Sequence, residues 1–445
     1  MNAAVPNVPD QTVSGVPLGT AEVDVLFKDL FQFSCLALGV SGGADSVALL
    51  RSMHAWQVRS GWSGKLVVLT VDHCLRTGSA DDAEFVHELC ASLHLRHKIL
   101  VWEGDKPSAN LQGEARNARY ALMAEAMHNE QADALVLAHH QGDQVETFLD
   151  RLTRGSGVYG LGGMADDEPA GPEGLRIIRP FLDVPKDRLV SHLKDLGQTW
   201  CEDPSNQNEG FKRVRLRNLV ASLADEGLQL DRLLETTRRL RRTADAIDIW
   251  VERVFADDVE VHPAGPCRLG HAAYVNLPEE IRLRLLSRLI RSVSGQTYSS
   301  RLVKLEKLDQ ALCADQATKN TLGGVIVMGE AGKLYFWKEL GREALRVMDL
   351  EPGCSCIWDK RFHVSVMVGS DTGDSLYLGR LADAPFDNGT CIVPSGWPKQ
   401  VFSSAPAVWD DQQLLFAPGL FGSDTAAELG IKLVTMVNSR SSSVL

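Results

Sequence analysis

The sequence predicts an α/β fold, with a parallel, doubly wound sheet in its N-terminal half, then a helical domain and a small mixed α+β domain. Three observations lead to this prediction. The chain has 445 residues, which is too long for one ordinary core. Residues 30 to about 200 alternate short β-type runs with helical patterns, which is typical of parallel strands joined by crossover helices. Polar motifs follow three of these runs, where open α/β sheets bind their ligands.

The N-terminal half has a regular order of expected elements. Strands are expected at Cys35–Val40, Leu66–Asp72, His97–Trp102, Ala134–Ala138 and Arg176–Arg179. Helices are expected to begin near Gly43, Ser79, Asn110 and Asp143. Ser79 is a residue type that caps helices, and acids follow it in the first turn.

The pattern changes after Pro204. Residues 218 to about 310 are mostly helical in pattern, and the runs 321–328 and 333–337 are expected to form a hairpin. Residues 350–445 are rich in Gly, Pro, Ser and Asp, which favours a small mixed domain. We therefore expect a disordered leader over 1–28, the α/β domain over 29–217, a mainly helical domain over 218–345, and a small C-terminal domain with a frayed tail over 346–445.

Composition narrows the class of protein. The chain is 44% hydrophobic and 23% charged, as in soluble globular proteins, and no apolar stretch approaches the ~20 residues of a membrane span. The first twenty residues lack a signal-peptide pattern, so the nine cysteines are expected to be reduced thiols in a cytoplasm. No Cys-x-x-Cys pair occurs, and the closest spacing, Cys354-Ser-Cys356, is a weak metal signal.

The net charge of −12 argues against a protein that coats nucleic acid without specificity. Basic residues nevertheless gather in three places: residues 212–217, residues 238–242, and the series Arg282, Arg284, Arg288 and Arg291. Each cluster alone is typical of a solvated helix face. Three clusters within one region favour contacts with phosphates.

A turn rich in glycine joins the first expected strand to the first expected helix. It reads Ser41-Gly42-Gly43-Ala44-Asp45-Ser46. Adjacent glycines allow close approach of the backbone to a ligand, and the following helix directs unpaired N–H groups and partial positive charge at the turn. Asp45 adds a carboxylate that could hold magnesium beside an anion. The turn predicts polyphosphate binding, although it is neither a Walker loop nor the Gly-x-Gly-x-x-Gly of dinucleotide folds.

Two further motifs follow expected strands. Asp72 and His73 could contact ribose or the adenine edge, with Arg76 near a phosphate, but a polar loop alone is the commoner explanation of such residues. The segment from His139 to Asp143 places two histidines before an acid that begins a helix, which suits metal binding or proton transfer. Zinc would need further close ligands, and no cysteine pair supplies them, so the pattern favours ATP chemistry. All three motifs are expected at one edge of the sheet.

These motifs resemble those of a known family. Ser41–Ser46 resembles the Ser-Gly-Gly-x-Asp-Ser loop of the PP-loop ATP pyrophosphatases, which cleave ATP between the α and β phosphates to adenylate a substrate. Four later segments resemble, in order, motifs of the tRNA(Ile)-lysidine synthetases: Val71–Arg76, Asn110–Tyr120, Ala138–Leu161 and Asp203–Arg217. On spacing alone, the second of these would be an ordinary charged helix. The resemblance covers roughly residues 33–220.

Three positions depart from the family pattern. Cys74 stands where the family usually has glycine, Val214 replaces an asparagine, and Gly142 replaces the first of two aspartates. If that missing acid helps to hold magnesium, then either metal affinity is lowered or Asp45 and ATP carry the duty.

The resemblance implies a reaction and a set of residues. ATP would adenylate O2 of the wobble cytidine in the CAU anticodon of tRNA(Ile), and the amine of free L-lysine would displace AMP at C2, with ATP and Mg²⁺ as cofactors. Asp143 and His139 would orient or deprotonate the amine, and Arg119 and Arg217 would stabilise charge on the α-phosphate. The implied catalytic residues are Asp45, His139, Asp143, Arg119 and Arg217; the ATP-binding residues are Ser41, Gly42, Gly43, Ala44, Asp45, Ser46, Asp72 and His73; the tRNA-binding residues are Arg154, Arg213, Arg215 and Arg217; and Asp45 is the metal ligand.

Two other functions stay open on sequence alone. A PP-loop tRNA thiolase would use the same loop, although it normally needs cysteines to bind a cluster or carry sulfur. A non-catalytic nucleotide- or RNA-binding protein on the same fold is kept open by Cys74, Gly142 and Val214. The sequence also leaves open whether the chain forms a homodimer.

Overall fold

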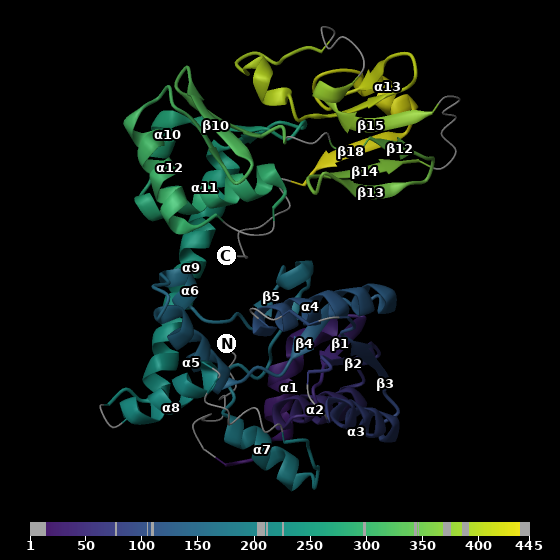
Figure 1. Ribbon diagram of the computed structural model, residues 1–445, viewed down its shortest axis with the longest axis vertical. Helices are drawn as coiled ribbons and strands as arrows, with labels where there is room; N and C mark the ends of the chain where they lie inside the picture. The colour runs from purple at the N-terminus through teal and green to yellow at the C-terminus, as the bar shows by residue number, and fades with distance from the viewer. Residues whose placement is uncertain are drawn as a thin grey trace, which may run out of the picture. The chain divides into compact units, whose positions relative to one another are not determined.

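The computed structural model describes residues 15–75, 78–104, 106–107, 111–202, 210, 212–224, 227–296, 300–341, 345, 347–367, 375–384 and 391–436. The chain divides into two compact units between Ala244 and Asp245, and Figure 1 shows their elements. Asn110, Arg76, residues 203–209 and the expected tail from Asn438 lie outside the described residues.

The first unit is built on a six-stranded sheet with the order β3-β2-β1-β4-β6-β5. The strands are β1 (Cys35–Gly39), β2 (Lys65–Asp72), β3 (Arg96–Val101), β4 (Ala134–Leu137), β5 (Asp167–Glu168) and β6 (Ile177–Ile178). All neighbouring strands are parallel except β5 and β6. The predicted α/β class and its five parallel strands are confirmed. Since β2 and β4 flank β1, the chain winds away from β1 in both directions.

Helices cover both faces of this sheet (Figure 1). The helices of the first unit are α1 (Thr20–Phe27), α2 (Ala44–Ser60), α3 (Ser79–Ser92), α4 (Leu111–Glu130), α5 (Gln141–Leu152), α6 (Val158–Leu161), α7 (Lys186–Asp195), α8 (Lys212–Ala224) and the start of α9 (Leu230–Asp258), with 3-10 turns η1 (Lys28–Gln32) and η2 (Pro172–Gly174). Alternate β1 residues point to opposite faces, as strand geometry requires. Leu36 packs with Trp56 of α2 and Leu189 of α7, whereas Ala37 packs with Met123 of α4.

The start of α3 differs from the prediction in one detail. Gly78, with φ of 96°, is the N-cap, and Ser79 is the first helical residue. A glycine takes the cap position because the backbone there is left-handed, a conformation that serine adopts only with strain. The Ser79 side chain instead bonds to Asp72, at the end of β2.

The prediction of a disordered leader over residues 1–28 is wrong for its last third. Residues 20–27 form α1, and Leu18, Val23 and Phe27 are buried in the core that also contains α2 and α7. The buried Glu22 carboxylate accepts two hydrogen bonds of 2.7 Å from Arg188 of α7. This long-range ion pair, which no local pattern predicts, holds the segment in place.

A smaller helical cluster extends the first unit past the expected boundary at residue 217. Val145 and Phe148 of α5 pack with Leu216 of α8 and Leu233 of α9. Because the first turns of α9 belong to this cluster, the unit ends at Ala244, within α9.

The second unit contains more strand than the predicted helical domain over 218–345. Its first sheet has the order β7-β8-β11-β10-β9. Its elements are β7 (Glu260–Val261), β8 (Cys267–Gly270), α10 (His271–Val275), α11 (Glu279–Ser294), α12 (Leu302–Ala314), β9 (Lys319–Leu322), β10 (Val325–Glu330) and β11 (Lys333–Lys338). Val327 and Phe336 pack against Leu286 of α11, so the helices cover a sheet instead of forming a bundle.

The expected hairpin is confirmed, with Glu330 paired to Lys333 across the turn. Its first strand was predicted as one run over 321–328, but two strands are present, β9 and β10. Gly323 and Gly324, with φ of 60° and 73°, form the turn between them. Adjacent glycines adopt this left-handed backbone without strain.

The C-terminal part of the second unit mixes antiparallel sheets with one helix and short 3-10 turns. The sheet orders are β12-β15-β16-β17 and β13-β14-β18. The elements are β12 (Met348–Leu350), β13 (Ser355–Trp358), β14 (Phe362–Val366), β15 (Leu376–Arg380), η4 (Leu381–Asp383), η6 (Lys399–Phe402), β16 (Pro406–Trp409), β17 (Leu414–Phe416), α13 (Ser423–Glu428) and β18 (Ile431–Thr435).

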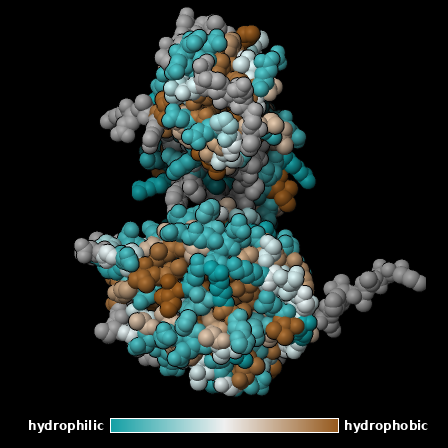
Figure 2. Space-filling model, turned by 90° about the vertical axis from the view of Figure 1, so that its right-hand side faces the viewer, coloured by the Kyte–Doolittle hydropathy of each residue, from teal (hydrophilic) through white to brown (hydrophobic). Residues whose placement is uncertain are grey.

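The described helices include none that is both long and apolar enough to cross a bilayer. On the face drawn in Figure 2, hydrophobic residues lie in separate patches among hydrophilic ones.

Candidate active site

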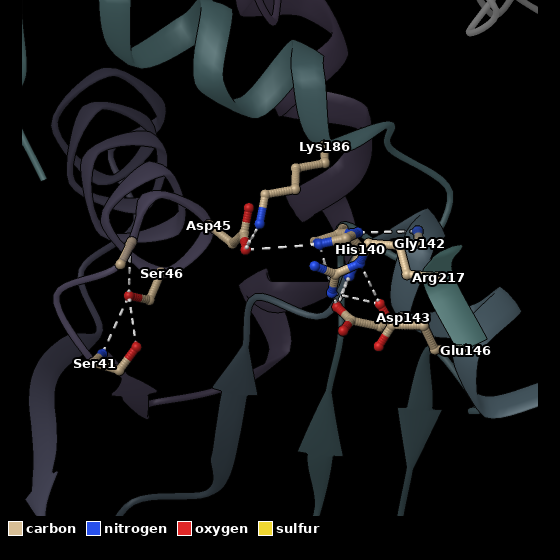
Figure 3. Close-up of polar contacts among 10 residues, drawn as sticks. Ser41, Asp45, Ser46, His140, Gly142, Asp143, Glu146, Lys186 and Arg217 are labelled. Carbon is tan, nitrogen blue, oxygen red and sulfur yellow. Dashed lines mark hydrogen bonds and ion pairs between the residues drawn. The ribbon is translucent and has the colours of Figure 1, made fainter. Parts of the chain in front are cut away.

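The Ser41–Ser46 turn lies between β1 and α2 and is held by its own serines (Figure 3). The Ser46 hydroxyl accepts a hydrogen bond from the Ser41 N–H at 3.1 Å and donates one to the Gly43 carbonyl at 2.9 Å. Gly42 has φ of 87°, the left-handed backbone that glycine adopts freely. Gly43 is the N-cap of α2 and makes no side-chain capping bond. The 17-residue helix α2 therefore presents its first N–H groups to an anion in the turn.

A second segment braces this turn from outside. The Cys201 N–H donates to the Gly42 carbonyl at 2.9 Å. A Cβ at position 42 would lie 3.4 Å from Cys201 Sγ. The turn is therefore constrained by residues about 160 positions away, which favours a preformed anion site.

Asp45 lies in the first turn of α2, beside the anion site. Its Oδ2 is 3.2 Å from the Lys186 ammonium, at the start of α7. Its Oδ1 is buried and has no hydrogen-bond partner. Mg²⁺ in ATP enzymes is commonly bound by one or two carboxylates plus phosphates and water, and an unpartnered carboxylate oxygen fits that requirement. Among the described residues, no three His, Cys, Asp or Glu side chains gather as a metal site of their own.

Asp143 and His140 lie at the start of α5. This helix follows β4, the strand next to β1. Asp143 Oδ2 accepts the His140 N–H at 2.9 Å, and His140 Nδ1 accepts the Gly142 N–H at 2.9 Å. This reciprocal arrangement is a capping box. His140 Nε2 lies 3.6 Å from Oδ2 of Asp45 and 3.6 Å from Oδ2 of Asp143. The helix begins at Gln141, two residues before the expected start at Asp143.

Arg217 faces α5 through Glu146. Nε of Arg217 donates to Oε1 of Glu146 at 2.9 Å, and Nη2 donates to the same oxygen at 2.5 Å. The Glu146 side chain is only 4% exposed, whereas that of Arg217 is 52% exposed. The guanidinium therefore pairs a buried carboxylate and still meets solvent. Figure 3 shows this pair next to Asp143.

Asp72, His73 and Arg119 gather at the end of β2. Arg119 Nη2 lies 3.4 Å from His73 Nε2. Burial, reinforced by the Arg119 charge, lowers the pKa of His73 to about 4, so its imidazole is neutral at pH 7. Burial opposes ionisation of Asp72, but hydrogen bonds from Cys74 and Ser79 outweigh it and hold the Asp72 pKa below its ordinary value. The Cys74 N–H donates to Asp72 Oδ1 at 2.8 Å.

Cys74 keeps the turn that a glycine would make. Its φ is 52°, in the left-handed region. A residue with a Cβ is strained in this region, so the cysteine adopts a glycine-like backbone at an energetic cost.

The residues implied to bind tRNA lie around α5 and α8. Arg154 is exposed and pairs with Asp150 at 2.8 Å. Arg215 is exposed and donates to the Gly210 carbonyl at 2.9 Å. Arg213 lies in α8, but its side chain is outside the described part of the chain. Val214 lies in the same helix and is half-buried.

The geometry brings together some implied residues and adds others. Asp45 and Asp143 meet through a histidine, but that histidine is His140, which sequence analysis did not choose over His139. His139 is half-buried on the same strand end. Lys186 and Glu146 were also missed. The signal for Lys186 was a lone lysine just after a proline at a helix start; the signal for Glu146 was weak, because one acid in an amphipathic helix is common.

Comparison with known proteins identifies the family to which this chain belongs. The PP-loop domain family matches residues 19–224. A tRNA(Ile)-lysidine synthase of Ruegeria pomeroyi is 33% identical, covering 86% of this chain and 88% of that protein. Another from Bradyrhizobium diazoefficiens is 36% identical, covering 72% and 93% respectively. A solved U34-tRNA thiolase of Methanococcus maripaludis matches 50% of this chain and 78% of that one, with 16% identity and a TM-score of 0.43. With such identity over nearly the whole length of its relatives, this chain belongs to the tRNA(Ile)-lysidine synthase family of PP-loop ATP-using ligases.

Proposed function

We propose that this protein joins lysine to C2 of the wobble cytidine in tRNA(Ile) with a CAU anticodon. In the first step, cytidine O2 attacks the α-phosphorus of ATP and pyrophosphate leaves. In the second, the amine of free L-lysine attacks C2, loses a proton, and releases AMP. The observation that carries the proposal is the meeting of Asp45, beside the anion turn, with Asp143 across His140.

The Ser41–Ser46 turn suits the pyrophosphate part of ATP. Its glycines allow the phosphates to approach the backbone, and the N-terminus of α2 offers N–H groups and partial positive charge. Lys186, half-exposed beside Asp45, adds a cation at the same place. Such a site acts by positioning phosphates and neutralising charge that develops on the leaving group.

Asp45 is the residue that would hold Mg²⁺. Its buried, unpartnered Oδ1 supports this assignment. When bound with ATP, the ion would neutralise phosphate charge. Gly142 has no carboxylate to share the ion, so in this chain the phosphates and water would supply the remaining ligands.

Asp143 and His139 are proposed to receive and orient the lysine amine. His139 lies in the short segment between β4 and α5, and Asp143 lies in the first turn of α5; β4 is the strand next to β1. An amine attacks only as the free base, and a nearby carboxylate or neutral imidazole can take its proton. Arg119 and Arg217 are proposed to stabilise charge on the α-phosphate.

The tRNA would be held by arginines around α5 and α8, namely the exposed Arg154, Arg215 and Arg217 together with Arg213. A wobble base in a loop can be splayed into a pocket, which is how proteins usually read RNA sequence. A cytoplasmic location follows from the substrates of this proposal.

The test incubates the full-length protein with ATP, radiolabelled lysine and a tRNA(Ile) transcript that carries a CAU anticodon. We expect label in the tRNA and one AMP per lysine incorporated. The control transcript has guanosine in place of the wobble cytidine and should take no label. Absence of label and of AMP with the CAU transcript would refute the proposal, and incorporation of sulfur from a thiol donor would favour the thiolase alternative.

A further inference from the structure

His140 lies between the two carboxylates that the proposed function requires. It comes from the end of β4, Asp45 comes from α2, and Asp143 comes from α5 (Figure 3). The histidine side chain is only 7% exposed, and its Nε2 is 3.6 Å from one oxygen of each aspartate. A buried ring at equal distance from two acids can influence the spacing of both.

The hydrogen bond at Nδ1, the other ring nitrogen, shows which of the two nitrogens carries the proton. Nδ1 of His140 accepts the Gly142 N–H at 2.9 Å. A nitrogen that accepts a hydrogen bond carries no proton, so the neutral ring carries its proton on Nε2. That N–H faces the two acids and offsets their mutual repulsion. At 3.6 Å the contacts are electrostatic, and such contacts often shorten when ligands bind.

Gly142 is the residue that makes this ring position available. A Cβ at position 142 would lie 2.8 Å from His140 Cε1 and 3.1 Å from Nδ1. Carbon atoms do not approach so closely, so the present ring position excludes any side chain at 142. The φ of Gly142 is not in the left-handed region. The backbone therefore does not require glycine here, whereas the imidazole does.

We propose that His140, seated on Gly142, is a positioning residue that holds Asp45 and Asp143 in register through Nε2–H. This inference rests on the proposed function, because that function gives the two aspartates their tasks. Asp45 faces the ATP phosphates and Asp143 faces the amine, so their spacing decides whether the two steps share one site. Gly142, which stands where the family pattern has an aspartate, leaves room for the ring of His140.

Two substitutions separate positioning from helix capping. His140→Asn keeps an acceptor near Nδ1, and asparagine is among the best N-caps, but it cannot reach the carboxylates. His140→Gln places an amide N–H near Nε2 but loses the cap. If the ring positions the acids, His140→Asn should lower kcat of lysine incorporation about tenfold to a hundredfold, with KM for tRNA little changed. His140→Gln should recover most of that loss. The reverse order would show a capping role only and overturn the proposal.

Gly142→Ala provides a second and independent test. Alanine is a better helix former than glycine, which should offset much of the cap that α5 loses when the ring is displaced, so the variant should still fold. It should nevertheless displace the ring and lower kcat to the level of His140→Asn. The double variant should lose no more than either single variant, because both remove one contact. Full activity in Gly142→Ala would overturn the proposal.

A spectroscopic measurement tests the arrangement without activity. Nitrogen-15 NMR of histidine-labelled full-length protein should show, among the signals of the twelve histidines, one that is missing from His140→Asn, and that signal should belong to a ring protonated at Nε2. In Gly142→Ala this signal should move. A ring protonated at Nδ1 would overturn the proposal. Failure of the wild-type protein to label tRNA would refute the proposed function instead, and the NMR signal would still report the ring.

Discussion

Arg188 holds Glu22 through two parallel hydrogen bonds of 2.7 Å, between side chains that are 7% and 8% exposed. Arg188 also donates to the Val16 and Pro17 carbonyls. The same helix begins with Lys186, which contacts Asp45. One helix thus anchors the N-terminal segment and contributes to the candidate active site.

Removal of one partner from this buried pair should be costly. Glu22→Ala leaves the Arg188 charge buried without its carboxylate, so we expect a loss of about 3–5 kcal/mol in the free energy of unfolding. Urea denaturation measures it. The control is Asp24→Ala, which breaks the partly exposed pair with Arg59 and should cost less than about 1 kcal/mol. Equal, small losses in both variants would contradict a structural role for the buried pair.

Asp45→Ala should abolish AMP release and lysine incorporation while tRNA binding stays largely intact. The physical reason is that the carboxylate beside the anion turn would no longer hold an ion next to the phosphates. Turnover and filter retention of labelled tRNA measure the two properties. Loss of tRNA retention with ATP cleavage preserved would show that the role of Asp45 is assigned wrongly.

Cys74→Gly should stabilise the protein. The cysteine is held at φ of 52°, and glycine would remove about 1 kcal/mol of strain, offset in part by the greater freedom of glycine in the unfolded chain. Urea denaturation should show a net gain. The neighbouring Leu75→Gly is the control, because Leu75 has no positive φ, and it should destabilise by about 0.5–1 kcal/mol. A loss in Cys74→Gly as large as that in the control would contradict the strain.

Arg217→Ala should lower both stability and tRNA-dependent turnover. It leaves Glu146, whose side chain is 4% exposed, without its guanidinium, which should cost about 3 kcal/mol. Addition of Glu146→Gln removes the buried charge and should restore much of the stability. If Arg217 also contacts tRNA or the α-phosphate, kcat/KM for tRNA stays low in the stable double variant. Recovery of both properties would mean that Arg217 only pairs Glu146.

Glu130 should make the free energy of unfolding depend on pH in the acid range. Hydrogen bonds from Lys65 and Lys98, together with the charge of Arg96, lower the Glu130 pKa to about 2. A carboxyl whose pKa is depressed on folding contributes stability above its unfolded pKa of 4.5 and loses it as the pH falls towards 2. Because the three cations are partly exposed, Glu130→Gln should cost about 1 kcal/mol at pH 7.

Urea denaturation at several pH values tests this dependence. The difference between wild type and Glu130→Gln should be constant from neutral pH down to about 5 and should vanish near pH 2. The exposed Glu84→Gln should match wild type throughout. A difference that persists at pH 2 would mean that the carboxylate charge is not responsible.

Sequence predicted the first sheet well because its strands carry strong local patterns. In β1 and in the middle of β2, successive side chains are buried on both faces, and most of them are apolar. The convergence of Ser41–Ser46 with the motif at 139–143 also followed, because parallel strands end at one edge. These inferences needed only strand type and chain order.

The features that sequence missed depend on long-range contacts or on one rotamer. The helix α1 is held in place by the pair between Glu22 and Arg188, two residues that are 166 positions apart. His140, and not His139, accepts a hydrogen bond from an N–H in the first turn of α5. The sequence His139-His140 alone does not show which of the two rings does so. Lys186 meets Asp45 across 141 positions, which no spacing rule anticipates.

The pairing of β1 with β4, in which Gly39 lies opposite Leu137, has a consequence for how activity is lost. Adjacent strands are held about 4.8 Å apart by their hydrogen bonds, so Asp45 and Asp143 are brought together by the innermost part of the sheet. We therefore expect the spacing of Asp45 and Asp143 to be lost together with the central strands. Catalytic competence should persist through loosening of peripheral loops and disappear in the same cooperative step as the central strands, so residual activity serves as a gauge of the folded fraction.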